Sequence, residues 1–344
     1  MRHVAGASGA PVASYDADVV ILSLDRPEET AAAIRSALTQ TGVSRHVFVV
    51  DQGSRPENLA CLAGTVASRG DVTLVALDAN FGVAGGRNRG TALGHGSVIF
   101  GLDNDAEFAD DATLARAVAA LDADPALAAI GCRIVVHATG ADDLSSWGYP
   151  RSLLPRAGDE FAAVTFVGAG HAIRRTAWDA CGGYDDALFF CWEEFDFCLR
   201  AIALGWRIRY HGEIAIRHKV SAEQRLAWSG TRWFYFVRNR LYIGRKWGAS
   251  WLTLAPRFAG YILKGAHNGV LRQTLAAFPA AIRLSASLAV RTLPADARAY
   301  LRAHDAVHRG SLLNRVRHEV MAMMPLTGPT IRSRHANQIS GQSS

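Results

Sequence analysis

The stretch Ser97-Val98-Ile99-Phe100-Gly101-Leu102-Asp103-Asn104-Asp105 decides the fold. Its apolar run is typical of a buried strand, and two acids with one residue between them follow where that strand ends. Adjacent carboxylates repel each other, so the pattern favours a divalent cation such as Mg²⁺ or Mn²⁺, which in turn binds phosphate. In the alternative interpretation these acids lie in a loop that caps the next helix, because Asp110-Asp111-Ala112-Thr113 follows closely.

Three apolar runs precede this stretch and alternate with helix-like segments. The predicted strands cover residues 18–24, 47–50 and 72–77, and the predicted helices cover residues 27–40, 57–68 and 85–93. This alternation indicates an α/β fold with a doubly wound, mostly parallel sheet. Ligands of such sheets bind beyond the carboxyl ends of the strands. Four polar residues lie at or just past those ends: Asp25, Asp51, Asn80 and Asp103.

The α/β pattern continues beyond Asp105 and then gives way to helices. A helix over 112–123, strands over 130–136 and 161–167, a long loop over 137–158, a helix over 195–204 and short strands over 207–210 and 213–217 are predicted. We expect four regions along the chain. They are a flexible leader over 1–17, an α/β domain over 18–230, a helical region over 231–325 and a disordered tail over 326–344.

Charge divides the chain of 344 residues into two unlike halves. The net charge is +6, yet residues 201–344 contain 22 Lys and Arg against 5 Asp and Glu. Basic helices with an apolar face suit an anionic membrane surface. Packing on the main domain or contact in a homo-oligomer explains them equally well. We expect no nucleic-acid partner, because no nucleic-acid motif is present and the aromatic residues are not spaced for stacking on bases.

Cysteine usage and hydropathy indicate a protein of the cytoplasm. The five cysteines include no CxxC pair, which argues against a zinc site, and their odd number argues against a disulfide framework. Residues 1–17 lack the apolar core of a signal peptide, and no apolar run is long enough to span a bilayer. We therefore expect a cytoplasmic protein that binds peripherally to the inner face of the cytoplasmic membrane.

Over residues 18–247, the order of short motifs resembles inverting family 2 glycosyltransferases with the GT-A fold. The closest likeness is to the bacterial rhamnosyltransferase-like and galactofuranosyltransferase-like branch. The motifs are Leu22-Ser23-Leu24-Asp25-Arg26-Pro27, Val49-Val50-Asp51-Gln52-Gly53-Ser54, Asn80 to Gly90, Leu102-Asp103-Asn104-Asp105, Gly168-Ala169-Gly170 with Arg174-Arg175, Trp192 to Arg200, Ile216-Arg217-His218 and Arg238-Asn239.

The resemblance implies a metal-dependent enzyme with a nucleotide-diphosphate sugar donor, dTDP-rhamnose or a UDP-sugar. Its acceptor would be a hydroxyl of a glycan or lipid-linked molecule in polysaccharide or glycolipid biosynthesis. The implied donor site comprises Ser23, Asp25, Asp51, Asn80, Gly82, Arg87 and Asp103. The implied ligands of Mg²⁺ or Mn²⁺ are Asp103, Asp105 and His218. The implied catalytic base is Glu194, with Trp192, Glu193 and Asp196 at the acceptor.

Several of these residues also have a structural interpretation. Asp51 before Gly53 is typical of a capped turn, and Trp192 suits a core position. Asp25 favours either a ribose hydroxyl or a pair with Arg26, and Asp196 suits either a pair with Arg200 or an acceptor hydroxyl. The Glu193-Glu194 pair replaces the commoner Glu-Asp or Asp-Asp, which leaves open which acid is the base.

Other function classes fit the sequence less well. A nucleotidyltransferase of related fold would also use paired acids and metal, but the Trp192-Glu193-Glu194 element and His218 disfavour it. A non-catalytic scaffold of the same fold would be free to lose Asp103, Asp105, Glu194 and His218, all of which are present. An NAD-dependent oxidoreductase is excluded because no GxGxxG follows the first strand.

Overall fold

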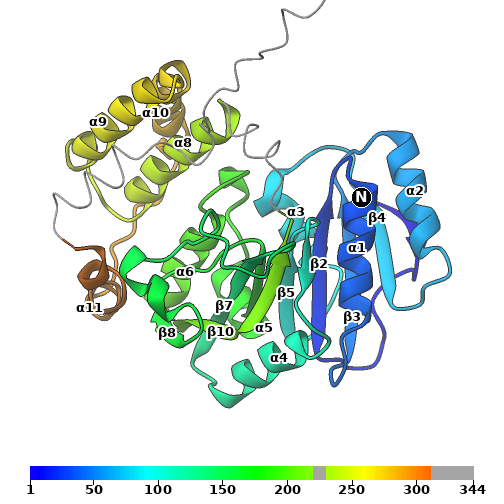
Figure 1. Cartoon of the computed structure of the whole chain (residues 1–344). Helices are drawn as coiled ribbons and strands as arrows, with labels where there is room; N and C mark the ends of the chain where they lie inside the picture. Colours follow the sequence, from blue (N-terminus) through cyan, green and yellow to red (C-terminus); the bar gives the residue numbers. More distant parts are fainter. Residues whose placement is uncertain (220–229, 311–344) are drawn as a thin grey trace, which may run out of the picture.

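A mixed sheet of ten strands forms the centre of the α/β domain in the computed structural model, which describes residues 1–219 and 230–310 (Figure 1). The strands lie in the order β1-β4-β3-β2-β5-β9-β7-β10-β6, and β8 pairs with β10. Their bounds are β1 Arg2–Gly6, β2 Ala17–Ser23, β3 Arg45–Asp51, β4 Val72–Ala76, β5 Val98–Leu102, β6 Ala106–Phe108, β7 Leu127–Val136, β8 Glu160–Ala163, β9 Gly170–Arg174 and β10 Arg207–His218.

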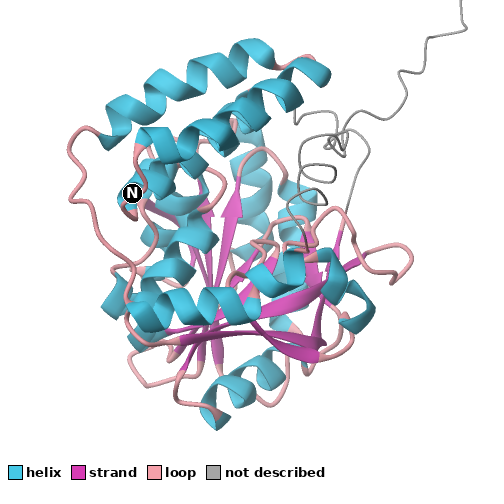
Figure 2. Ribbon diagram, turned by 90° about the vertical axis from the view of Figure 1, so that its left-hand side faces the viewer, coloured by secondary structure: helices cyan, strands magenta, loops and turns pink. Residues whose placement is uncertain are grey.

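Most strands run in one direction, as the sequence predicts. Strands β4, β3, β2 and β5 pair in parallel, and so do β7 and β10. Strand β9 lies antiparallel between β5 and β7, and β1, β6 and β8 are antiparallel to their neighbours. The strands lie between helices in the view of Figure 2. The predicted α/β class is therefore confirmed.

The helices of the α/β domain begin where the sequence supplies starting residues. Pro27 and Pro56 occupy the first turns of α1 and α2, where a missing backbone N–H costs nothing. Glu28 and Glu29 complement the positive end of α1. The bounds are α1 Pro27–Leu38, α2 Pro56–Val66, α3 Gly82–Thr91, α4 Thr113–Ala123, α5 Arg175–Cys181 and α6 Glu193–Ala203.

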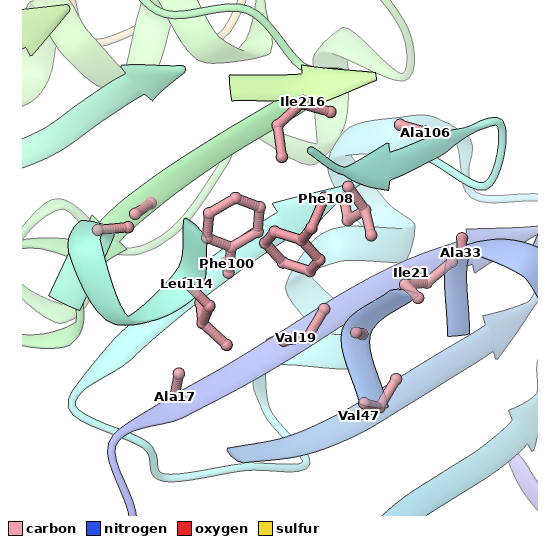
Figure 3. Packing of buried hydrophobic residues seen from close by; sticks show 14 of the residues in the cluster. Ala17, Val19, Ile21, Ala33, Val47, Phe100, Ala106, Phe108, Leu114 and Ile216 are labelled. Atoms are coloured by element: carbon pink, nitrogen blue, oxygen red, sulfur yellow. The ribbon is translucent and has the colours of Figure 1, made fainter. Parts of the chain in front are cut away.

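Strand β5 lies in the centre of the larger core, which explains its unbroken apolar run. All five of its residues are buried, as in a strand that is covered on both faces of the sheet. The rings of Phe100 on β5 and Phe108 on β6 lie 4.7 Å apart between centroids, and Leu114 of α4 lies beside them (Figure 3). This packing fixes the end of β5, and so the start of the Asp103-Asn104-Asp105 segment.

Four features of the α/β domain differ from the sequence-based expectations. The expected leader over 1–17 contains β1, which pairs with β4 at the edge of the sheet. The expected loop over 137–158 contains a short 3₁₀ helix at Arg151–Arg156. The strand expected over 161–167 ends at Ala163, and the two short strands expected over 207–217 are one strand, β10. Strands β6 and β9 and helix α5 were not predicted.

Helices α8 Thr231–Lys246, α9 Trp251–His267 and α10 Leu271–Ser285 pack on one another around Trp233, and α11 Ala295–His304 returns to the α/β domain. Trp233 donates a hydrogen bond from Nε1 to Thr274 Oγ1 at 2.7 Å, joining α8 to α10. No helix within the described ranges combines the length and the apolar character needed to cross a bilayer. The predicted end of the helical region at 311–325 and the tail at 326–344 lie outside the described residues.

Candidate functional site

Three strand ends bring the predicted metal ligands together at one edge of the sheet. Asp103 and Asp105 follow β5 directly, and the next strand, β6, pairs with the end of β10. In that pairing His218 lies opposite Ala106, the residue after Asp105. The imidazole of His218 therefore lies beside Asp105, with 3.5 Å between Nε2 and Oδ1.

Asp143 holds His218 in this orientation. Its Oδ2 atom lies 3.1 Å from Nδ1 of His218, and its side chain also accepts hydrogen bonds from Ser145 and Ser146. Burial opposes the imidazolium, but hydrogen bonds with Asp105 and Asp143 outweigh it and raise the pKa of His218 to about 10. Fixing one ring nitrogen on a carboxylate, so that the other faces the site, is the arrangement found around metal-bound histidines.

An arginine pairs with each acid of the Asp103-Asn104-Asp105 segment. Arg26 donates from Nη1 to Asp105 Oδ2 at 2.9 Å, and Arg87 donates from Nη2 to Asp103 Oδ1 at 2.8 Å. Although burial favours the neutral acid, hydrogen bonds from His218 and Arg26 lower the pKa of Asp105. Both carboxylates are thus supplied with positive charge by the chain itself.

The donor set suits a divalent cation, although the chain alone does not complete it. Asp105 and His218 offer an oxygen and a nitrogen to one ion, and the side chain of Asp103, 40% exposed, lies next to them. Within residues 1–219 and 230–310, no three His, Cys, Asp or Glu side chains are already gathered in a group that could hold a metal. The chemistry of Asp105 and His218 is therefore compatible with a divalent cation, and Asp103 lies beside them.

Arg87 lies beneath this edge. Its guanidinium is buried and donates to the carbonyl oxygen of Val20 at 2.7 Å as well as to Asp103. The structure therefore favours a role in orienting Asp103 over the direct donor contact that the resemblance implied.

The residues expected around the nucleotide base form a network of turns. Asp51 is buried, and its Oδ1 accepts the backbone N–H groups of Gly53 and Ser54 at 3.1 Å each, which is the turn-capping alternative. Asp25, which is exposed, accepts from the backbone N–H of Arg55 at 2.8 Å and from Asn58. Asp25 therefore pairs with Arg55 and not with Arg26, contrary to one of the two expectations from the sequence.

Ser23, Asn80 and Gly82 also have structural partners. The hydroxyl of Ser23 lies 3.2 Å from that of Thr30 and is buried. Asn80 accepts the backbone N–H of Gly82 at 2.8 Å and so begins α3. Gly82 adopts φ +73°, and a side chain at this position would collide with the carbonyl of Phe189. These three residues shape the edge of the expected donor site.

The two adjacent glutamates lie in different environments. Glu193 is 2% exposed, and no described residue donates a hydrogen bond to its Oε2 atom. Burial and the charge of Glu194 raise the pKa of Glu193, which keeps it neutral. Glu194 is partly exposed, and its carboxylate lies against Gly168, where any Cβ would collide with it.

Glu194 is the better candidate for a base. Burial and the charge of nearby Asp103 raise its pKa to about 7, near the value that suits proton transfer at neutral pH. Gly168 belongs to the Gly168-Ala169-Gly170 segment, and the carbonyl of Ala169 accepts the backbone N–H of Asp103 at 3.2 Å. The glutamate and the paired acids therefore lie on the same edge of the sheet.

Two of the residues expected at the acceptor are used in packing. Asp196 is fully buried, and its Oδ2 accepts from Arg200 at 2.9 Å and from Lys246 at 3.0 Å. Trp192 donates from Nε1 to the carbonyl of Phe236 at 3.0 Å and packs against that ring. Of the two roles that the sequence allows for Asp196, a partner of Arg200 or an acceptor contact, the structure shows the first. Trp192 is joined to α8, and Glu193 is buried away from the surface that an acceptor would reach.

The segment Ala187 to Trp192, which we call the base loop, leads into α6 through an unusual backbone. Phe189, Cys191 and Trp192 have φ values of +61°, +68° and +74°. Positive φ is costly for bulky residues and persists only where neighbouring structure imposes it. The conformation of the base loop must therefore be imposed by contacts with neighbouring elements.

Helix α8 holds the base loop through its backbone carbonyls. Nδ2 of Asn239, which is fully buried, lies 2.8 Å from each of the carbonyl oxygens of Leu188, Phe190 and Cys191. Arg238 donates from Nη2 to the carbonyl of Ala187 at 2.7 Å and from Nε to Asn239 Oδ1. The first turn of α3 holds the loop from the other side, since Val83 donates its N–H to Phe189 O at 2.6 Å.

Sequence reasoning missed three supporting residues of this site. Asp143 lies in a polar stretch without a motif, so no sequence pattern relates it to His218. For Arg26 the sequence suggests only a pair with Asp25. The Arg238-Asn239 motif gives no role for Asn239, and only the fold shows the three carbonyls that it contacts.

Comparison with known proteins agrees with this geometry. Residues 18–181 match the family described as Glycosyl transferase family 2. The chain is similar to the O-antigen biosynthesis protein RfbC of Myxococcus xanthus, with 23% identity over 248 residues that make up 66% of this chain and 19% of that protein. It is also similar to the succinoglycan biosynthesis protein ExoO of Rhizobium meliloti (strain 1021), with 35% identity over 125 residues, 36% of this chain and 35% of that protein. The chain thus matches about a fifth and about a third of the length of these relatives.

Solved structures share the fold at low sequence identity. The mannosyltransferase PcManGT from Pyrobaculum calidifontis, in complex with GDP-Man and Mn²⁺, superposes with a TM-score of 0.54 at 20% identity over 88% of this chain and 89% of that one. GalNAc-T7 with UDP, GalNAc and Mn²⁺ gives a TM-score of 0.59 at 14% identity over 90% of this chain and 59% of that one. Both likenesses concern the fold.

Proposed function

This chain carries a family 2 glycosyltransferase domain of the GT-A fold, and from this premise we propose the reaction that it performs. The chain moves a sugar from a nucleotide-diphosphate donor to a hydroxyl of a glycan or lipid-linked acceptor. The reaction serves the biosynthesis of a polysaccharide or glycolipid. The two curated relatives are named for O-antigen and succinoglycan biosynthesis, which supports this class of product.

The observation that carries the proposal is the position of Glu194. A carboxylate with a pKa of about 7 lies on the same edge of the sheet as Asp103, Asp105 and His218. A general base and a site for the leaving diphosphate are the two parts that a direct displacement at a sugar carbon requires.

Glu194 accepts the proton of the acceptor hydroxyl while that oxygen forms a bond to the anomeric carbon. The bond from this carbon to the diphosphate oxygen breaks in the same step, so the configuration inverts. Asp105, His218 and Asp103 would hold Mg²⁺ or Mn²⁺, which when bound would supply positive charge against the leaving diphosphate. Arg26 and Arg87 keep the two aspartates in place.

The donor is dTDP-rhamnose or a UDP-sugar, as the motif resemblance implies. Two structural neighbours were solved with Mn²⁺ and with GDP-Man or UDP, which supports a divalent cation beside a nucleotide. In this proposal the turn held by Asp51 at Gly53 and the start of α3 held by Asn80 would shape the donor site near Ser23, Asp25 and Gly82.

The acceptor is a lipid-linked glycan at the inner face of the cytoplasmic membrane. Support comes from the basic helical region, since residues 230–294 contain ten Lys and Arg and no Asp or Glu. A chain that works on lipid-linked glycans gains from residing at the surface where they are presented.

A panel of nucleotide sugars tests the proposal through two measurements on the full chain. Thermal shift with dTDP-, UDP- and GDP-sugars, each with Mg²⁺ or Mn²⁺, identifies the donor, because a bound ligand stabilises the folded state. Glu194→Gln is then compared with the unchanged chain for transfer and for donor binding. We expect loss of transfer with donor binding retained. No stabilisation by any nucleotide sugar, or full transfer by Glu194→Gln, contradicts the proposal.

A further inference from the structure

Helices α9 and α10 expose large apolar side chains to solvent. Leu252 is 87% exposed and Leu263 63% exposed on α9, and Leu275 is 50% exposed on α10, where Leu271 and Ile282 are also exposed. We call these five residues the hairpin face. Large apolar side chains gathered on an exposed surface mark a site of interaction.

The residues of the hairpin face form one apolar stripe on each of two helices that pack on each other. Helix α9 packs through Leu254, Phe258 and Gly265, and α10 packs through Thr274 and Ala277. Each residue of a helix turns by about 100°, so Leu252 and Leu263 fall on one side of α9, away from its packed side. Leu271, Leu275 and Ile282 fall on one stripe of α10 in the same way. Figure 1 shows α9 and α10 side by side at the outside of the molecule.

Positive charge borders the hairpin face on both helices. Arg257 on α9 and Arg272 and Arg283 on α10 are exposed, and none of the carboxylates in the described ranges forms an ion pair with them. The absence of Asp and Glu from residues 230–294 leaves this charge uncompensated along the helices. The surface therefore has an apolar centre and a cationic border.

We propose that the hairpin face docks on the surface of an anionic lipid bilayer. The leucines and Ile282 enter the boundary between headgroups and acyl chains, and the arginines bind lipid phosphates, as in interfacial helices. A second copy of this chain is a less favourable binding partner for this surface than an anionic bilayer. A twofold contact through this surface would bring arginines of one copy against arginines of the other, and like charges repel.

Flotation of the purified full chain with vesicles tests the proposal in the absence of donor and acceptor. Vesicles of phosphatidylcholine alone are compared with vesicles that also contain phosphatidylglycerol. We expect binding only to the anionic vesicles and weaker binding at high salt. Equal binding to both vesicles, or binding to neither, overturns the proposal.

Matched variants identify the surface. Leu252→Ser, Leu263→Ser and Leu275→Ser together are compared with Val12→Ser, Leu144→Ser and Leu204→Ser, which change equally exposed apolar side chains elsewhere. The first set should lower vesicle binding by about tenfold or more, and the second should leave it unchanged. Equal loss in both sets contradicts docking through the hairpin face.

A second pair of variants examines the charged border. Arg257→Glu with Arg272→Glu should abolish binding to the anionic vesicles, whereas Arg2→Glu with Arg151→Glu, also exposed, should leave most of it. Light scattering on the same proteins detects self-association. A dimer that the serine variants dissociate would assign the surface to a second copy and overturn the proposal.

The inference rests on the proposed function in one respect only, namely that the hairpin face docks on the inner face of the cytoplasmic membrane. Transfer to a soluble acceptor, measured on the same variants, separates the two proposals. Lost docking with retained transfer leaves the glycosyltransferase proposal intact. If the unchanged chain binds vesicles but shows no transfer, the docking proposal stands and the glycosyltransferase proposal does not.

Discussion

Glu194 is the residue on which the proposed chemistry depends, and its surroundings determine the pH range in which it works. Burial raises its pKa to about 7, above the usual range of a glutamate. The base must be deprotonated, so transfer should fall by about tenfold for each pH unit below that value and level off above it. Single-turnover rates at saturating donor measure this directly. A rate that stays constant down to about pH 5 would exclude Glu194 as the base.

The raised pKa of Glu194 also determines how its contribution to folding stability changes with pH. A carboxyl whose pKa is higher in the folded than in the unfolded chain binds protons more tightly when folded, so its contribution to stability declines as pH rises from the unfolded value toward about 7. Above that pH, Glu194→Gln removes a buried charge and should not lower the melting temperature. This makes the variant a clean test of catalysis.

Asn239 holds the base loop, so in the proposed reaction it would position Glu194 without touching the reacting atoms. Asn239→Leu keeps the side-chain size but removes the donor that lies 2.8 Å from three carbonyls of the base loop. A small displacement of Glu194 should lower kcat by about a hundredfold with little change in KM for the donor.

Thr274→Val is the control for Asn239→Leu. It breaks the bond from Trp233 to α10 and leaves the base loop untouched. Both variants should lose stability, but only Asn239→Leu should lose kcat. An unchanged kcat in Asn239→Leu would reduce Asn239 to a purely structural residue.

Residue types predicted the edge of the sheet well and the individual contacts less well. The acids after β5 and the histidine at the end of β10 lie together, as the family resemblance implied. Asp25 is different, because its partner Arg55 comes from another part of the chain. Asp196 pairs with Arg200 of its own helix, as the sequence allows, but its second partner Lys246 comes from α8. A sequence shows which side chains can pair, but only the fold brings two elements to the same place.

Helix α5 is tied to the sheet by one ion pair at its first residue. Arg175 donates from Nη2 to Asp18 of β2, which is fully buried, and from Nε to the carbonyl of Gly96 at 2.6 Å. Arg175→Met should lower the free energy of unfolding by about 3–5 kcal/mol, because it leaves a buried carboxylate without its cation.

Urea unfolding followed by circular dichroism measures the effect of Arg175→Met. Adding Asp18→Asn to this variant should recover part of the loss, since the uncompensated charge is removed as well. A loss below about 1 kcal/mol would show that the pair behaves like a solvent-exposed one.

Elements with a long apolar run were predicted, and short ones were missed. Strands β2, β3 and β5 have unbroken buried runs, which local periodicity detects. Strand β6 has three residues, and β1 pairs only at the edge of the sheet. Such strands are stabilised mainly by pairing with a neighbouring strand, so their own sequence gives little indication that a strand will form.

Across the whole molecule, α11 closes the chain back onto the α/β domain. The hydroxyl of Tyr300 lies 3.0 Å from the carbonyl oxygens of Ala163 and Ile208 and accepts the N–H of Ile208 at 3.1 Å. Tyr300→Phe should lower the free energy of unfolding by about 1–2 kcal/mol, because it leaves these buried groups unpaired.

Limited proteolysis is the more specific measurement for Tyr300→Phe. Faster cleavage between α10 and α11 is expected, since that connection is free to open once α11 is loosened. Tyr261→Phe, a change within the helical region, should leave the cleavage pattern as it is. Equal cleavage of the two variants would show that α11 is not held through Tyr300.

The ends of the segment that forms α9 and α10 meet at one point. The backbone N–H of Arg291 donates to the carbonyl of Lys246 at 2.8 Å, so the chain leaves α8 and returns beside it. A segment with adjoining ends can change in length or be exchanged while the parts before and after it keep their places. If the hairpin face docks on membranes as proposed, evolution can change the preferred membrane surface without changing the reaction. Chimaeras of related chains joined near Gly248 and Arg291 should then exchange the vesicle preference and keep the donor specificity.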